Sequence, residues 1–172
     1  MRQLVRKTGV SLLLAVCAAC DLPPMISDTG YVGTWSRGND RNVSIVAIAE
    51  LNGRWFFRWT KHSFDGKLTI HCDWEGRCEE RLNGALAATY AITTHFDGAS
   101  RTLSTETIEE RIVPSALTLR YTDVMEVKDA GLTLWNFTME RNGQHYEGPA
   151  RPQRSFAKVS NSVADPPRQE MR

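Results

Sequence analysis

Short turn signals that contain glycine recur along the chain and constrain its fold more than any other feature. Each supplies the positive φ angle that a tight β-hairpin needs, and runs rich in β-branched and aromatic residues lie between them. Pro114 divides the one long interval. The pattern predicts strands joined by hairpins. The signals are Asn52-Gly53, Asp65-Gly66, Glu75-Gly76, Asn83-Gly84, Asp97-Gly98, Ala130-Gly131 and Asn142-Gly143.

Consecutive hairpins without crossover helices imply antiparallel pairing, so we expect residues 31–148 to form one all-β domain. About eight to ten strands would leave unpaired edges unless the sheet closes. We therefore predict an up-and-down meander closed into a β-barrel. A two-sheet β-sandwich is the alternative. Residues 149–172 contain several prolines and basic residues, and we predict that they form a flexible basic tail.

The hairpin around Asp65-Gly66 allows a test of register. A two-residue turn there sets Trp59 opposite Cys72 and Phe57 opposite Trp74. Both strands then present their apolar residues to one face, which supports the pairing.

The next loop, Trp74-Glu75-Gly76, sets Cys72 directly opposite Cys78. Opposed Cα atoms in a ladder are about 4.5–5.5 Å apart, within the range of a disulfide. We predict a cross-strand disulfide, with two buried free thiols as the alternative.

Past Asn83-Gly84 the pattern leaves two alternatives. A two-residue turn would set Leu82 opposite Ala85, and the apolar residues of the following strand would then share a face with Glu79 and Arg81. Either the loop is longer than two residues, or polar side chains line the interior here.

The N-terminus has the features of a targeting segment. Arg2, Arg6 and Lys7 precede the short apolar run Val10–Val16, and small residues follow. Even together with the small residues that follow, this segment is only about ten residues long, too short to span a hydrocarbon core of about 30 Å. A buried N-terminal helix is the alternative, but no amphipathic period is present.

Cys17-Ala18-Ala19-Cys20 follows this run and resembles a bacterial lipobox. The resemblance implies that residues 1–19 are a lipoprotein signal peptide and that Cys20 is diacylated and becomes the new N-terminus. Cys17 stands where that family usually has an aliphatic residue, and Cys17 itself is the rival acceptor. With Cys20 lipidated and the other two mature cysteines paired, no thiol is left over.

The lipobox resemblance also implies a location. The protein would be attached through lipid to the inner or outer membrane of a bacterial cell envelope, facing the periplasm, with residues 20–30 as the lipidated cysteine and a spacer. Asp21 resembles an inner-membrane retention signal.

Gly33-Thr34-Trp35 lies near the start of the first predicted strand and resembles the G-x-W motif of lipocalins. The resemblance implies an eight-stranded barrel that carries small apolar ligands, with Trp35 closing its floor. Thr122-Asp123-Val124 is a partial match to a second lipocalin motif, but it falls inside a predicted strand. Arg141 is the candidate for the late arginine of that family.

Charge and histidine spacing exclude several classes of function. Residues 21–150 carry a net charge of −5, whereas nucleic-acid binding needs a basic face. His62 and His71 are predicted to share an outer face, which is a weak metal site without a third ligand. His95 and His145 are isolated. We predict neither a metal nor a cofactor.

The acidic residues form two groups, Glu79-Glu80 and Glu106 with Glu109 and Glu110. On one strand Glu106 and Glu110 would be about 13 Å apart, farther than the usual glycosidase pairs. No nucleophile-elbow or metalloprotease motif is present. We expect no catalytic residues, and a hydrolase is the weakest of the rival classes.

The leading hypothesis is non-catalytic binding of a small apolar or amphipathic ligand inside the barrel. The alternative is a protein-interaction module, such as an envelope-assembly factor or an enzyme inhibitor, which requires exposed apolar residues such as Phe56 or Phe64 grouped in one patch. An open cavity favours the first, and a filled barrel with such a surface patch favours the second. The predicted ligand-binding residues are Trp35, Trp55, Phe57, Trp59 and Trp74.

Overall fold

The computed structural model describes residues 30–146 and 151–167. Within these residues no helix is long and apolar enough to cross a membrane. The described strands are β1 (Gly33–Gly38), β2 (Asn42–Leu51), β3 (Arg54–Ser63), β4 (Leu68–Cys72), β5 (Arg77–Leu82), β6 (Ala85–Asp97), β7 (Thr102–Arg111), β8 (Leu117–Lys128), β9 (Gly131–Arg141), β10 (Gln144–Tyr146) and β11 (Arg151–Ser160).

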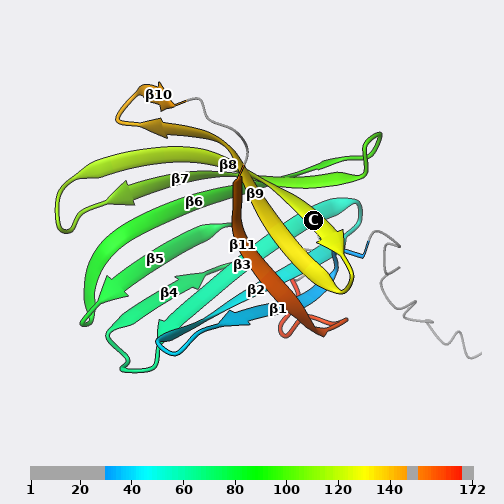
Figure 1. Ribbon diagram of the computed structural model, residues 1–172, viewed down its shortest axis with the longest axis horizontal. Helices are drawn as coiled ribbons and strands as arrows, with labels where there is room; N and C mark the ends of the chain where they lie inside the picture. Colours follow the sequence, from blue (N-terminus) through cyan, green and yellow to red (C-terminus); the bar gives the residue numbers. More distant parts are fainter. Residues whose placement is uncertain (1–29, 147–150, 168–172) are drawn as a thin grey trace, which may run out of the picture.

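The sheet closes on itself. Strands β1 to β9 pair in chain order, and β11 pairs with both β9 and β1, so ten strands form an antiparallel barrel (Figure 1). The short strand β10 pairs with the end of β9. The predicted antiparallel barrel is confirmed, and the β-sandwich is excluded because one continuous sheet closes. The described barrel has ten strands, whereas the lipocalin resemblance implies eight.

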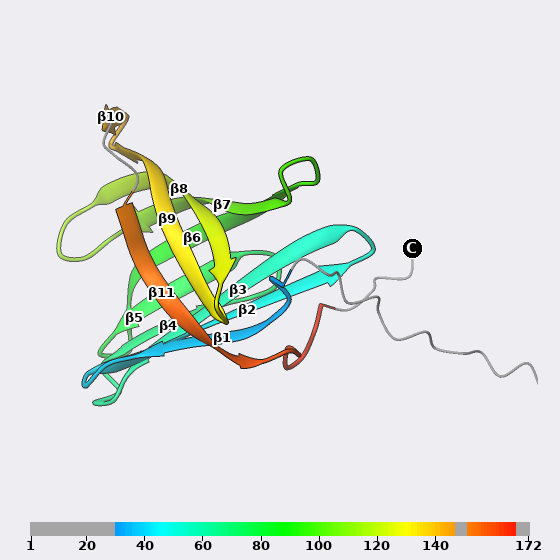
Figure 2. The same ribbon diagram turned by 45° about the vertical axis from the view of Figure 1, so that its right-hand side comes forward.

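The C-terminal segment corrects the predicted domain boundary. Residues 151–160 are not a flexible tail, because β11 is the strand that closes the barrel (Figure 2). Phe156 points into the core, while its neighbours Ser155 and Ala157 are exposed. Proline and charged residues in β11 obscure the alternation of buried and exposed positions in its sequence. The expected signal peptide, Cys20 and the spacer up to residue 29 lie outside the described residues.

One part of the interior is apolar and fully packed. Trp35, Ile48, Leu103 and Leu132 come from four strands, and each side chain is completely shielded from solvent. Burial of such side chains is worth about 1.5–3 kcal/mol each. The Trp35 indole N–H donates to the carbonyl of Tyr31 at 3.0 Å, so its one polar group is satisfied.

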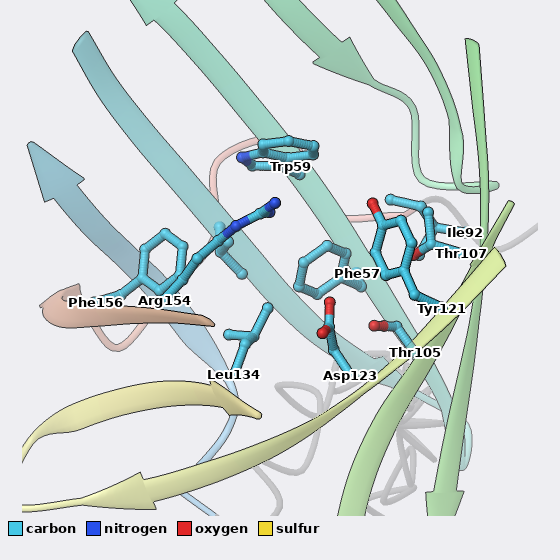
Figure 3. Close-up of a pocket in the computed structure, with 11 residues that line it drawn as sticks. Phe57, Trp59, Ile92, Thr105, Thr107, Tyr121, Asp123, Leu134, Arg154 and Phe156 are labelled. Carbon is cyan, nitrogen blue, oxygen red and sulfur yellow. The ribbon is translucent and has the colours of Figure 1, made fainter. Parts of the chain in front are cut away.

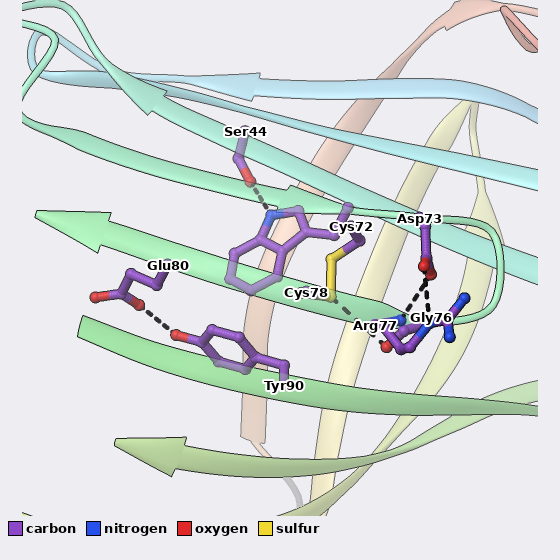
Figure 4. The surroundings of a disulfide bond; sticks show 9 residues. Ser44, Cys72, Asp73, Gly76, Arg77, Cys78, Glu80 and Tyr90 are labelled. Carbon is purple, nitrogen blue, oxygen red and sulfur yellow. Dashed lines mark hydrogen bonds and ion pairs between the residues drawn. A yellow bond between two sulfur atoms is a disulfide. The ribbon is translucent and has the colours of Figure 1, made fainter. Parts of the chain in front are cut away.

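The predicted disulfide is confirmed: Cys72 and Cys78 lie opposite each other on β4 and β5 and are bonded (Figure 4). Gly76 in the intervening loop has φ +81°. A Cβ atom there would lie 1.9 Å from the carbonyl oxygen of Ile92, so only glycine fits.

A β-bulge resolves the two alternatives for the hairpin at Asn83-Gly84. Leu82 does lie opposite Ala85, but the register shifts between Glu80 and Arg81. Glu80 faces the interior because it alternates with buried Cys78, and the shift places the buried residues Ala88 and Tyr90 opposite Glu80 and Cys78. The turn is short, and polar side chains do line the barrel here.

The hairpin between β3 and β4 has the predicted register but is shorter than predicted. Thr60 to His62 pair with Thr69 to His71, as expected from Trp59 facing Cys72. The two strands do not pair beyond these residues, so Phe57 and Trp74 are not partners. The turn also spans residues 64–67 rather than two residues.

Candidate functional site

A buried network of charged groups occupies the interior beside the bulge. Arg111 on β7 donates to Glu109 and, at 3.2 Å, to Glu80. Tyr90 donates to Glu80, as Figure 4 shows. Both carboxylates are largely buried, with side-chain exposures of 8% for Glu109 and 11% for Glu80. Burial acts to lower the pKa of Arg111, but the bonds and charges of Glu109 and then Glu80 raise it overall. The guanidinium therefore stays charged.

The same environment keeps Tyr90 protonated. Burial, followed by its hydrogen bond to Glu80, raises the pKa of the phenol. The network binds its own members, and no catalytic base or nucleophile is left unpaired within it.

A second polar group lies across the interior, where Asp123, Tyr121 and Arg154 line a small cavity with Thr105 and Thr107 (Figure 3). Burial raises the pKa of Tyr121 to about 12. Asp123 accepts a hydrogen bond from the Asn136 amide at 3.3 Å. Phe57, Trp59 and Phe156 are among the apolar residues that complete the wall.

The cavity has a volume of about 10 Å³, enough for about one water molecule. Trp35, Phe57 and Trp59, three of the predicted ligand-binding residues, are packed into the core with at most 6% exposure. In this conformation they fill the barrel instead of lining an open space.

A substitution of Asp123 tests how burial of its carboxyl affects the stability of the folded barrel. Burial raises its pKa, which outweighs the opposing effects of the Asn136 bond and the Arg154 charge. A carboxyl whose pKa is higher in the folded state contributes its full stability below the unfolded pKa and loses it as pH rises through the folded pKa. Asp123→Asn should therefore raise the free energy of unfolding at neutral pH and lose this advantage in acid. Urea unfolding at both pH values checks the sign, and an equal effect at both would contradict it.

Within the described part of the barrel wall, two strand edges are unpaired over part of their length. On its β4 side, β3 pairs only through Thr60–His62, and β6 pairs with β5 only up to Ala91. No described strand pairs with residues 54–59 of β3 on this side, nor with residues 93–97 of β6. The β4–β5 hairpin is too short to fill the interval. In Figures 1 and 2 the β2–β3 and β6–β7 turns project to the same side of the barrel.

The orientation of this edge follows from one hydrogen bond. The main-chain N–H of Ile92 donates to Gly76 at 2.8 Å, across the side that faces β5. Alternate N–H groups of a strand point to the same edge. The N–H groups of Thr94 and Phe96 therefore point into the interval and are available to a further strand.

A groove of about 1260 Å³ lies over these edges and is lined by β3, β6, the loop after β4 and residues 165–167. Trp55 and Phe96 stack across it, with ring centroids 4.7 Å apart. On its β3 side, the Arg58 guanidinium lies 4.4 Å from the centroid of the Trp74 ring. The groove thus combines aromatic surfaces with unpaired main chain.

The chain's own segment 161–167 lies along the outside of the barrel and reaches this groove. Thr34 donates to the carbonyl of Ser162 at 2.8 Å and Arg58 to that of Ala164 at 2.8 Å. The Trp74 indole donates to the carbonyl of Asp165. Two side chains at the groove, those of Arg58 and Trp74, therefore already bind carbonyl groups of an irregular peptide segment.

The predicted site residues separate into two places. Trp35, Phe57 and Trp59 belong to the core, with Phe57 also reaching the groove, whereas Trp55 and Trp74 lie at the groove. The sequence predicted that these aromatics share one face, and it predicted pairing of Phe57 with Trp74 at a place where β3 and β4 in fact separate. The unpaired edge was missed, and the short β4–β5 hairpin was its only signal.

The other candidates are dispersed. His62 and His71 are exposed, and no group of three metal-binding side chains exists among the described residues. Glu106 forms an ion pair with Arg120, and Glu110 is exposed. Asp123 lies within β8, as the sequence indicated, and Arg141 is exposed at the end of β9. Phe56 is half-buried at the groove, whereas Phe64 lies apart in the β3–β4 turn.

The fold and the groove define a class: a closed ten-stranded barrel with a packed interior and an open strand edge. Comparison with known protein families, curated proteins and solved structures finds no match for this chain.

Proposed function

We propose that the protein is a non-catalytic interaction module of the bacterial envelope, anchored by lipid at Cys20, whose β3–β6 groove accepts an extended segment of a partner polypeptide. The observation that carries this proposal is the pair of unpaired strand edges facing an aromatic groove. Strand addition supplies main-chain hydrogen bonds for affinity, and side-chain pockets supply specificity.

The packed interior supports this choice over a ligand carried inside the barrel. A cavity of about 10 Å³ holds no apolar molecule unless core side chains move. An exposed strand edge, in contrast, is a template for pairing with another chain. The groove volume of about 1260 Å³ exceeds that of typical small-molecule sites.

Proline substitutions on β6 test the edge. Proline removes an N–H group and is tolerated where that group makes no ladder bond. Thr94→Pro should therefore lower the free energy of unfolding by less than about 1 kcal/mol. Thr93→Pro, whose N–H points to β7, should lower it by about 2–3 kcal/mol. Urea denaturation of the two variants checks this, and equal losses would show that the edge is not free.

Binding itself is tested by photo-crosslinking in growing cells. A photoreactive residue at Phe56, in the groove, should give a discrete adduct with a polypeptide, and the same residue at Thr69, on the exposed face of β4, should not. Adding Thr94→Pro should reduce the Phe56 adduct at least about tenfold, the loss expected for one or two main-chain bonds. Adducts that are equal at both positions, or unaffected by Thr94→Pro, would refute strand addition.

A further inference from the structure

Two partly buried cationic side chains lie at one end of the barrel interior, away from the groove, and a third, exposed one lies at the rim beside them. Lys61 and Arg154 follow the inward alternation of Trp59 and Phe156 on their strands, and Arg37 follows that of Trp35. In the ladder, Ser44 of β2 lies opposite both Arg37 and Lys61. The three cations therefore come from β1, β3 and β11 and converge at one rim.

The proximity of these charges is visible at Lys61. Burial lowers the pKa of its ammonium group, and the positive charges of Arg154 and Arg37 lower it further, with Glu80 acting in the opposite direction. The positive charges of the three side chains therefore repel one another, which destabilises the charged form of Lys61.

Trp59 orients one of the two inner cations. The Arg154 guanidinium lies 4.8 Å from the centroid of the Trp59 ring, and Figure 3 shows it directed toward that ring. The Trp59 indole N–H is already donated to the Ser44 hydroxyl at 2.6 Å. Arg154 is thus oriented by an aromatic face and keeps its N–H groups available.

The nearby carboxylates already have other partners. Glu80 and Glu109 share Arg111, and Asp123 accepts from Asn136. Across residues 30–146 and 151–167, no carboxylate forms an ion pair with Lys61 or Arg154. Partly buried cations are normally paired, so these two have an unmet preference for an anion.

We propose that this end of the barrel binds a small oxyanion, the carboxylate or phosphate group of a ligand, between Lys61 and Arg154 with Arg37 at the rim. The planar guanidinium can donate to two oxygens, and the ammonium to a third. Negative charge would also relieve the repulsion among the cations. Because the adjoining cavity has room for only about one water and Lys61 does not line it, the anion lies at the rim, outside the cavity, and the rest of the ligand extends away from the barrel.

The experiment is isothermal titration of the purified protein at low ionic strength, with inorganic phosphate and with acetate as separate probes. We expect saturable binding of at least one probe, and the stronger probe identifies the phosphate or the carboxylate class. Lys61→Gln and Arg154→Gln should each weaken it at least about tenfold. Lys67→Gln, a matched change of an exposed lysine in the β3–β4 turn, should leave it unchanged. Asp123→Asn, which removes a neighbouring negative charge, should strengthen it.

A thermal measurement keeps the outcome independent of any loss of fold in the variants. The bound probe should raise the Tm of the wild-type protein and of Lys67→Gln, but not that of Lys61→Gln, each compared with its own probe-free sample. Absence of saturable binding to both probes, or equal binding by Lys61→Gln and Lys67→Gln, would overturn the proposal. The groove plays no part in this test, so the oxyanion proposal can fail without affecting the proposal of strand addition, and the reverse also holds.

Discussion

Replacing Arg111 with leucine is expected to lower the free energy of unfolding by about 3–5 kcal/mol, because it leaves buried charges without their partner. Glu80 and Glu109 are both largely shielded from water, and Arg111 binds both. Urea denaturation at neutral pH measures the loss. The size of the effect reflects desolvated carboxylates with no counter-charge, not the net contribution of the intact pairs.

Arg120→Leu is the matched control. Arg120 lies on the neighbouring strand β8 and pairs with Glu106 at 3.8 Å, but both side chains are about half exposed. An exposed pair of this kind contributes about 0–1 kcal/mol. Combining Arg111→Leu with Glu80→Gln and Glu109→Gln should restore much of the lost stability, because no buried charge then remains unpaired. If Arg111→Leu were no more harmful than Arg120→Leu, the buried network would not be formed.

Replacing Cys20 with serine should move the protein almost completely from the membrane fraction to the soluble periplasmic fraction. The prediction follows from the lipobox resemblance, since serine cannot form the thioether to a diacylglyceryl group. Each buried CH₂ contributes about 0.8 kcal/mol, so two or more acyl chains hold a protein stably at a membrane. Fractionation with immunoblotting measures the location, and intact mass measures the acyl chains.

Cys17→Ser is the control for the acceptor. It should leave both the membrane fraction and the acyl mass unchanged, because Cys20 remains. Release by Cys17→Ser, with retention of Cys20→Ser, would assign the lipid to the rival acceptor. Retention of both single variants without any acyl mass would contradict a lipid anchor.

Local sequence patterns were sufficient to predict the hairpins of this barrel. The alternation through Trp59 and the three-residue loop ending at Gly76 predicted the facing cysteines, and the structure bonds them. These features depend on residues close in sequence, where turn chemistry and side-chain alternation act directly.

Features that depend on contacts between distant strands could not be predicted from local sequence patterns. The burial of Glu80 beside the bulge is compensated by Arg111, a residue of another strand that supplies the opposite charge. Phe156 was assigned to a tail, because its strand is recognisable only when β1 and β9 lie beside it.

The sequence by itself therefore determined the all-β class, the antiparallel order of the hairpins and the disulfide, since each rests on period-two alternation and turn residues. The closed sheet was also predicted, but only the tertiary structure decided that β11 is the strand that closes it, that aromatic side chains fill the interior, and that β3 and β6 keep unpaired edges. The physical reason is that closure and edge pairing depend on which strand ends meet in space, and no residue's own pattern encodes its neighbours across the barrel.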